Sequence, residues 1–292
     1  LTKANMLKYL RGCLRNSIID PLLVFTVAEW QAHPNEILDK IQSVFLDTQR
    51  LIIRSSAIGE DYMGHSRAGY YHTESGIYAK DTIHLNQAIC KVISSYSRNK
   101  RITNPEDQVI IQPQVDAVAI SGVILTRDLR SGAPYYVFNY DGATGLTNTV
   151  TQGLTGKALW LAHWLGAETL PCSWKKLLLA VQEIERIFQQ ETLDIEFGVD
   201  HSNHVHVFQV RPFATKKPFF NGDDRKVKEK VEQLEINLKK LTSGNNNLPG
   251  SRTILADMPD WNPAEIIGGR PNTLDRSLYR YVVTKSAWNK AF

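Results

Sequence analysis

The sequence predicts an α+β fold in which antiparallel sheets are flanked by helices. The first observation is a series of short runs rich in β-branched and aromatic residues, each bounded by turn residues, which is typical of antiparallel strands. The second is a set of intervening segments whose apolar residues recur at helical spacing. The third is the length of 292 residues, which exceeds the usual size of one domain and predicts two lobes or two cores.

The first part of the chain predicts helices on either side of one buried strand. Residues 1–48 indicate helical surface interrupted by an apolar run at residues 18–27, and a helix begins at Pro34. The run at residues 50–56 predicts a buried strand that delivers Arg54 to a loop. Glycines, tyrosines and histidines at residues 60–76 predict a polar loop. A helix is expected over residues 81–97.

The second part of the chain predicts mostly strands. Three β-rich runs, at residues 109–115, 119–128 and 135–141, indicate an antiparallel sheet. A helix follows, and its apolar positions are Leu177, Val181, Ile184 and Phe188. Runs at residues 193–199 and 205–211, joined by a polar turn, then predict a hairpin.

The C-terminal part predicts a change of organisation. A charged amphipathic helix at residues 223–241 precedes a polar, glycine-containing stretch at residues 243–250 that is typical of a linker. We therefore expect a two-lobed domain at residues 1–215, a charged helix and linker at residues 216–250, and the start of a following segment at residues 251–292.

Composition and charge exclude several classes of protein. Hydrophobic residues make up 42% and charged residues 22%, which is typical of an ordinary globular chain. The net charge of +4 arises from 34 basic residues scattered among 30 acidic ones, which argues against a nucleic-acid partner. The chain lacks the run of about 18 apolar residues that spans a bilayer and lacks a secretory signal, so we expect no membrane partner and a cytoplasmic location.

The cysteines predict neither a disulfide nor a zinc site. Cys13, Cys90 and Cys172 stand apart without the paired spacing that such sites need. We expect them to be small buried residues in a reducing compartment.

Four polar side chains in the predicted hairpin form a candidate site. Asp194 and Glu196 share one face of the first strand, and Gln209 and Arg211 share one face of the second. Carboxylate and carboxamide oxygens suit magnesium, and an arginine can hold a phosphate through two hydrogen bonds. The hairpin alone is better explained by an exposed ion pair, worth at most about 1 kcal/mol.

Six short motifs favour the first interpretation, because they occur in a fixed order along residues 51–212. They are IIRSSAIGED, SRAGYYHT, VIIQPQV, SGVILTRD, DIEFGV and FQVRP. Together they resemble the N-terminal nucleotide-binding domain of the phosphoenolpyruvate synthase and pyruvate phosphate dikinase family, which also includes rifampicin phosphotransferase. The resemblance implies an ATP-grasp-like, two-lobed domain that binds ATP and Mg²⁺.

The resemblance also implies roles for individual residues. Arg54 and Arg211 are expected to contact phosphates as catalytic residues, and Glu196 and Gln209 to hold the metal and the ribose-phosphate side. Arginines and a metal fit phosphoryl transfer, which needs positioning and positive charge around the triphosphate.

The remaining implied residues lie around that centre. Gly69 and Thr73 are expected in a loop that covers the phosphates, where a glycine lets backbone N–H groups approach oxygen. Gln112 is expected at the adenine edge. Lys3 resembles the lysine of the family's G-G-K motif, although the two glycines are not visible before it.

The implied reaction needs partners beyond these motifs. The family passes phosphoryl from ATP through a histidine in a TSH-type motif on a separate domain, and that motif is absent from these residues. The implied partners are a phosphohistidine-carrying domain, downstream or in trans, and a small-molecule acceptor. Residues 258–288 resemble a segment of a capsule-associated branch that includes L-glutamine kinase, which favours L-glutamine as acceptor.

Two other functions remain open. One is an ATP-grasp ligase that activates a carboxylate, and the other is a nucleotide-sensing module without catalysis. A separate cluster, His201, His204 and His206 beside Asp200, fits either a metal site or the polar residues of a hairpin turn.

Overall fold

The computed structural model describes residues 2–59, 71–97, 102–116, 118–142, 156–190, 192–213, 224–243 and 264–288. Gly69 and residues 244–250 of the predicted linker lie outside the described residues. The chain divides into two compact units, Leu1–Lys228 and Glu229–Phe292, and each is described by itself. The expected domain boundaries near residues 215 and 250 stay predictions.

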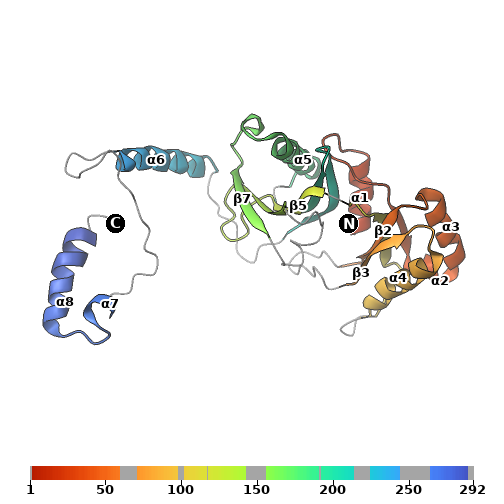
Figure 1. The fold of residues 1–292 in the computed structure, drawn as a ribbon, viewed down its shortest axis with the longest axis horizontal. Coiled ribbons are helices and arrows are strands. Elements are labelled where there is room, and N and C mark those ends of the chain that lie inside the picture. Colours follow the sequence, from red (N-terminus) through yellow and green to blue (C-terminus); the bar gives the residue numbers. More distant parts are fainter. Residues whose placement is uncertain are drawn as a thin grey trace. The chain divides into compact units, whose positions relative to one another are not determined.

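The first unit contains a four-stranded antiparallel sheet with helices against it (Figure 1). Its strand order is β1 (Leu23–Thr26), β4 (Gln108–Pro113), β2 (Arg50–Ser56) and β3 (Thr73–Tyr78). Its helices are α2 (Val27–Ala32), α3 (Pro34–Val44) and α4 (Thr82–Ser95). A capping box between Thr26 and Glu29 begins α2. Apolar faces of these helices and one face of the sheet form a core that includes Ile41, Ile53 and Ile89.

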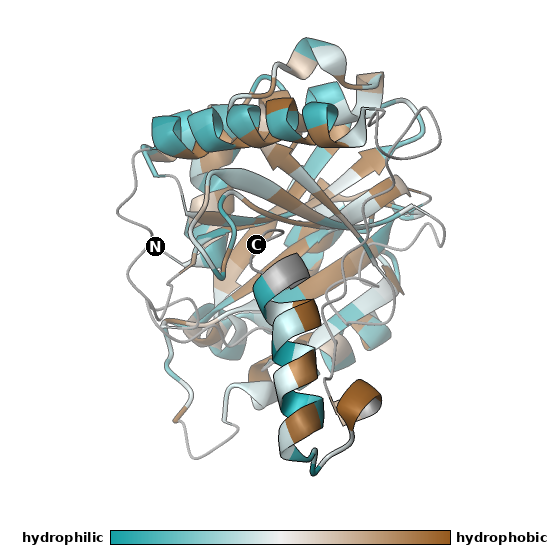
Figure 2. Cartoon of the chain, turned by 90° about the vertical axis from the view of Figure 1, so that its left-hand side faces the viewer, coloured by the Kyte–Doolittle hydropathy of each residue, from teal (hydrophilic) through white to brown (hydrophobic). Residues whose placement is uncertain are grey.

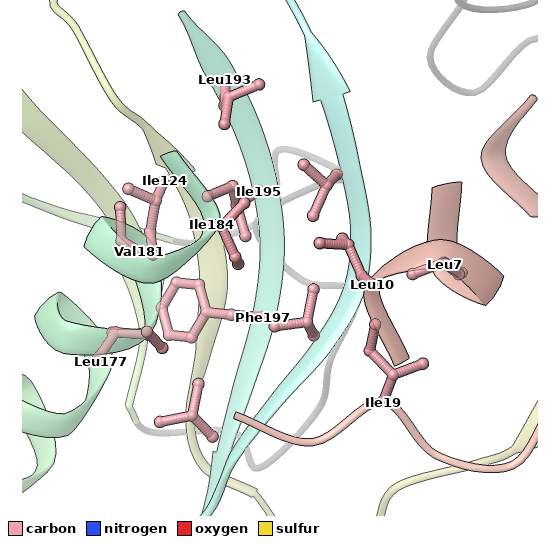
Figure 3. Packing of buried hydrophobic residues seen from close by; sticks show 14 of the residues in the cluster. Leu7, Leu10, Ile19, Ile124, Leu177, Val181, Ile184, Leu193, Ile195 and Phe197 are labelled. Carbon is pink, nitrogen blue, oxygen red and sulfur yellow. The ribbon is translucent and has the colours of Figure 1, made fainter. Parts of the chain in front are cut away.

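The same unit contains a five-stranded antiparallel sheet. Its order is β7 (Lys157–Ala162), β6 (Tyr135–Asp141), β5 (Val118–Leu125), β8 (Leu193–Asp200) and β9 (Val205–Pro212). It is accompanied by α1 (Lys3–Arg11), α5 (Cys172–Phe188) and the short 3₁₀ helix η2 (Ala167–Thr169). Figure 3 shows Phe197 of β8 beside Leu177 and Val181 of α5, while Leu10 reaches this second core from α1.

The α+β fold is confirmed, with two antiparallel sheets flanked by helices. The grouping of the three β-rich runs into one sheet is wrong, because β4 pairs with β1 and β2 whereas β5 and β6 pair in the other sheet. Alternation within a strand does not identify its partner. The burial of the three cysteines is also wrong, since all of them are exposed.

Gly122 lies at a close approach between the backbones of two strands of the five-stranded sheet. It faces Tyr140 across β5 and β6. A Cβ at Gly122 would lie 2.0 Å from the carbonyl oxygen of Asn139 and 2.8 Å from the Cα of Tyr140. Only a residue without a side chain fits this contact between backbones.

The second unit is described as helices. Helix α6 (Asp224–Thr242) crosses the division between the units, and it is followed by α7 (Ala264–Ile267), α8 (Thr273–Tyr279) and the π-helical segment η3 (Arg280–Trp288). The side chain of Asn272 caps the start of α8. None of the residues of α6 or α8 is buried. Across the described parts of the chain, every helix is too short or too polar to cross a membrane.

Candidate functional site

Arg54 connects the two sheets of the first unit. It lies in β2, and its Nη2 donates hydrogen bonds to Oε2 of Glu196 at 2.7 Å and to Oε1 of Gln209 at 3.2 Å. Its Nη1 donates to the carbonyl oxygen of Phe208 at 3.1 Å. The side chains of Arg54 and Glu196 are 18% and 21% exposed, so their ion pair is mostly shielded from water. Three predicted residues that are far apart in the sequence are thereby brought together.

A β-bulge in β9 supplies one of these contacts. Glu196 faces Gln209, but the next residue of β8 faces Val207, which leaves Phe208 as an extra residue. A bulged residue falls outside the regular ladder of backbone hydrogen bonds. Its carbonyl is the one that accepts from Arg54. Bulges commonly redirect side chains next to active sites.

The bulge also sets which side chains of β9 face the site. Val205, Val207 and Val210 are all buried in the same core, although the last two are three positions apart. A regular strand would place positions three apart on opposite faces. The extra residue therefore lets Gln209 and Arg211 point away from that core, toward the same side as the carboxylates of β8.

Arg211 forms a second ion pair beside the first. Its Nε and Nη2 both donate to Oδ2 of Asp194, at 2.8 and 2.6 Å, and the two residues are directly opposite in the β8–β9 register. Their side chains are 14% and 10% exposed. In the described structure the arginine predicted to clamp a phosphate is therefore bound to a carboxylate of the neighbouring strand.

Lys3 lies close to this centre because α1 begins there. The backbone N–H of Ala4 donates to Oγ of Ser56 at 3.0 Å, and Oγ1 of Thr2 donates to Oε1 of Gln108 at 2.6 Å. These contacts hold the first turn of α1 at the end of β2, two residues beyond Arg54.

Charge at the site favours ionised Glu196. Burial alone would raise the pKa of Glu196, but the charge of Arg54 and its hydrogen bond, with weaker contributions from Lys3 and Arg211, hold that pKa below its usual value. Three cations therefore surround two carboxylates, Glu196 and Asp194, which leaves a positive excess suited to an anionic ligand.

Two further predicted residues lie on strands that flank Arg54. Thr73 is directly opposite Arg54 in the β2–β3 register, so the two share a face of the sheet. Gln112 of β4 is buried and faces Ile52, on the same side as Arg54. The predicted loop at residues 60–76 is wrong at its end, because β3 already begins at Thr73.

The residues proposed as metal ligands fit a cation. Oε2 of Glu196 and Oε1 of Gln209 both point at the same guanidinium nitrogen of Arg54. Two oxygens on neighbouring strands therefore already converge on one positively charged position. This donor set is the kind that Mg²⁺ uses together with waters and phosphate oxygens.

The histidines of the hairpin turn are held by carboxylates. Nδ1 of His206 lies 2.9 Å from Oδ2 of Asp20, and Nδ1 of His204 lies 2.9 Å from Oδ2 of Asp200. Among the described residues no group of three or more His, Cys, Asp or Glu side chains is arranged to hold a metal ion. The metal interpretation of this cluster is therefore not supported, and its described contacts are those of a polar turn.

Some of the site was missed by sequence reasoning. The bulge at Phe208 has a signal in the sequence, because the spacing of the valines of β9 changes from two positions to three after Val207. The pairing of Arg211 with Asp194 follows from a register that the turn alone does not fix.

Residues 28–157 match the family model described as pyruvate phosphate dikinase, AMP/ATP-binding domain. The D-alanyl-alanine synthetase A of Vibrio cholerae is 13% identical to this chain with a TM-score of 0.41, and the match covers 79% of this chain and 63% of the synthetase. A dinucleotide-forming acetyl-coenzyme A synthetase 1 of Ca. Korarchaeum cryptofilum is 12% identical to this chain with a TM-score of 0.45, and the match covers 73% of this chain and 92% of the synthetase.

A third solved structure, the VanG D-Ala:D-Ser ligase of Enterococcus faecalis, is 12% identical with a TM-score of 0.37, and the match covers 72% of this chain and 51% of the ligase. The match thus spans less than two thirds of the Vibrio and Enterococcus enzymes. The match over residues 28–157 is to the AMP/ATP-binding domain of pyruvate phosphate dikinase, which confirms the resemblance that the motifs predict.

Proposed function

We propose that this chain holds Mg-ATP for phosphoryl transfer in a dikinase-like phosphotransferase. The observation that carries the proposal is the convergence of Arg54, Glu196 and Gln209 from two separate sheets on one partly shielded position. Such transfer needs mainly positioning and positive charge around the triphosphate. The family match supports a nucleotide as the ligand.

The roles of the residues follow from their places. Arg54, Arg211 and Lys3 supply cationic groups for the phosphate oxygens, and arginine can do so with two parallel hydrogen bonds. Glu196 and Gln209 would hold Mg²⁺, which neutralises phosphate charge when it is bound. Thr73, opposite Arg54, would lie on the phosphate side, and the buried Gln112 of β4 would contact the base.

In the proposed bound state the arginines exchange partners. Arg54 and Arg211 each pair with a carboxylate in the described structure. The phosphates would offer these guanidinium groups new acceptors, which frees Glu196 for the metal. A nucleotide without metal would leave Glu196 uncompensated near phosphate charge, so we expect Mg-ATP to bind more tightly than free ATP.

The rest of the proposed reaction lies outside this site. The phosphoryl group would pass to a histidine on another domain and then to a small-molecule acceptor, with L-glutamine as the acceptor suggested by residues 258–288. The site residues favour no particular acceptor.

Isothermal titration calorimetry of the purified chain tests the nucleotide site. Arg54→Met should weaken Mg-ATP binding by at least about 100-fold, since a hydrogen bond to a charged group contributes roughly 1.5 to 3 kcal/mol and Arg54 would make two. Arg50→Met is the matched control, because Arg50 lies on the same strand and pairs with Asp116 at 2.7 Å in a more exposed position. Equal affinity for Mg-ATP in both variants would refute the assignment.

Glu196→Gln tests the metal separately. It should weaken binding of Mg-ATP while leaving binding of ATP in the presence of EDTA unchanged or tighter. A loss that is equal with and without magnesium contradicts a role of Glu196 as a metal ligand.

The reaction class is tested by its products. A dikinase-type transfer predicts AMP and a phosphorylated histidine on an added carrier domain. Formation of ADP with an acid and an amine by this chain alone would favour a carboxylate ligase. Binding of Mg-ATP without either product would favour a nucleotide-sensing module.

A further inference from the structure

Helix α6 carries a regular line of apolar residues on a highly charged helix. The line, called the α6 stripe here, consists of Val227, Val231, Leu234, Leu238 and Leu241. Successive members are four and three positions apart in alternation, which is the heptad spacing of a coiled coil. In Figure 2, α6 is mostly hydrophilic with hydrophobic residues at intervals.

The α6 stripe is accessible to solvent in the described structure. Leu234, Leu238 and Leu241 are 59%, 51% and 59% exposed, and no residue of α6 is buried. In proteins, most of the stability of a helix comes from packing of its apolar face against another surface. We therefore expect the α6 stripe to pack against a partner surface.

The charges beside the α6 stripe fit a second copy of the same helix. Lys230 precedes a stripe residue and Glu235 follows one, so they occupy the two flanking positions of the heptad. In a parallel pair in register, each Lys230 faces the Glu235 of the other helix, five positions further on. The next flanking pair, Asn237 with Thr242, is uncharged, so no like charges face each other there.

Contacts within one helix do not prevent this arrangement. Glu235 accepts a hydrogen bond from Lys239 at 2.7 Å. The side chains of Glu235 and Lys239 are 64% and 75% exposed, so breaking this ion pair to form another costs little free energy. The stripe also has the composition of a two-stranded parallel coiled coil, with valine and leucine at one core position and mostly leucine at the other.

We propose that α6 forms a parallel, two-stranded coiled coil with α6 of a second copy of this chain. The main competing occupant is α8, whose exposed Leu274 and Leu278, together with Val282 one turn further on, could cover the α6 stripe within one chain. The coiled coil of two chains has twice the mass of one chain and forms in a concentration-dependent way, whereas contact of α8 with α6 within one chain changes neither the mass nor its dependence on concentration.

Sedimentation velocity of the complete 292-residue chain tests the proposal. We expect the mass to rise from 33.0 kDa toward twice that value over a roughly hundredfold range of concentration. Leu234→Lys and Leu238→Lys should each weaken the self-association by at least about tenfold, because a charge then enters the apolar interface.

Ile236→Lys is the matched control for these variants. Ile236 is 49% exposed on the same helix but lies outside the α6 stripe, and its replacement adds the same charge. It should change the dissociation constant by less than about twofold. A monomer at every concentration, or equal weakening by Ile236→Lys, would overturn the proposal.

A cross-link tests the orientation. With Cys13, Cys90 and Cys172 replaced by serine, Leu241→Cys should form a disulfide between two chains on oxidation, because parallel helices bring their C-terminal ends together. A dimer in which Leu241→Cys fails to cross-link contradicts the parallel arrangement.

Discussion

The ion pair between Arg54 and Glu196 should stabilise the first unit more than an ordinary surface pair does. We consider Arg54→Met and Glu196→Gln, singly and together. Arg54→Met keeps most of the apolar stem but leaves the carboxylate of Glu196 and the carbonyl of Phe208 without the guanidinium. Glu196→Gln keeps an oxygen acceptor and removes the charge.

The magnitude follows from burial. Exposed ion pairs contribute about 0 to 1 kcal/mol, whereas removing one partner of a fully buried pair costs about 3 to 5 kcal/mol. The side chains here are 18% and 21% exposed, so we expect each single variant to lose about 2 to 3 kcal/mol. The coupling energy of the double-mutant cycle should be about 2 kcal/mol.

Urea unfolding at pH 7, followed by circular dichroism, measures this cycle. A parallel cycle of Arg50→Met and Asp116→Asn is the control, since that pair has side chains 44% and 40% exposed. Its coupling energy should be below about 0.5 kcal/mol. Equal coupling energies in the two cycles would refute the reasoning that shielding strengthens the pair at the site.

The pH dependence of the same cycle gives an independent check. The pKa of Glu196 is lowered in the folded chain, chiefly by Arg54 acting against the effect of burial. The stabilisation is therefore fully present above the unfolded carboxyl pKa of about 4.3 and is lost as the pH falls through the lower folded value. Coupling that already declines between pH 7 and pH 6 contradicts this sign.

Two further predictions concern stability elsewhere in the first unit. Gly122→Ala should destabilise the fold by at least about 3 kcal/mol in urea unfolding, because its Cβ would lie 2.0 Å from the carbonyl oxygen of Asn139. Gly166→Ala is the control, since a Cβ there meets nothing within 4 Å. Equal losses of stability in the two variants would contradict the steric reason. The pKa of His206 is raised chiefly by its hydrogen bond to Asp20. The contribution of His206 to folding stability is therefore present below the unfolded pKa of about 6.5 and is lost as the pH rises through the folded value. A pH titration by NMR that gives a lowered pKa for His206 would disprove this.

Local patterns in the sequence were sufficient for most helices and strands. The start of α3 at Pro34 and the apolar face of α5 follow from short-range rules of capping and periodicity. The distribution of strands between two sheets did not follow, because β4 pairs with β1, a segment more than eighty positions earlier in the chain. Pairing over such distances depends on the tertiary packing of whole faces.

The motifs name residues of the candidate site but not their contacts, and the roles of these residues stay predictions. Motif order identified Arg54, Glu196, Gln209 and Arg211, and the structure brings them to one region of the first unit. The partner of Arg211 and the role of a backbone carbonyl in β9 depend on register and on the bulge, which a single sequence does not specify. The predicted burial of the cysteines was wrong because burial depends on the tertiary packing around each residue.

The two hydrophobic cores of the first unit have a consequence for native-state hydrogen exchange. Each sheet packs mainly in its own cluster of buried residues, and Arg54 of one sheet reaches across to the other. Protein regions with separate cores can open as separate cooperative units. The amides of the four-stranded sheet and those of the five-stranded sheet should thus exchange as two separate groups, and a ligand held by both sheets would slow both groups together.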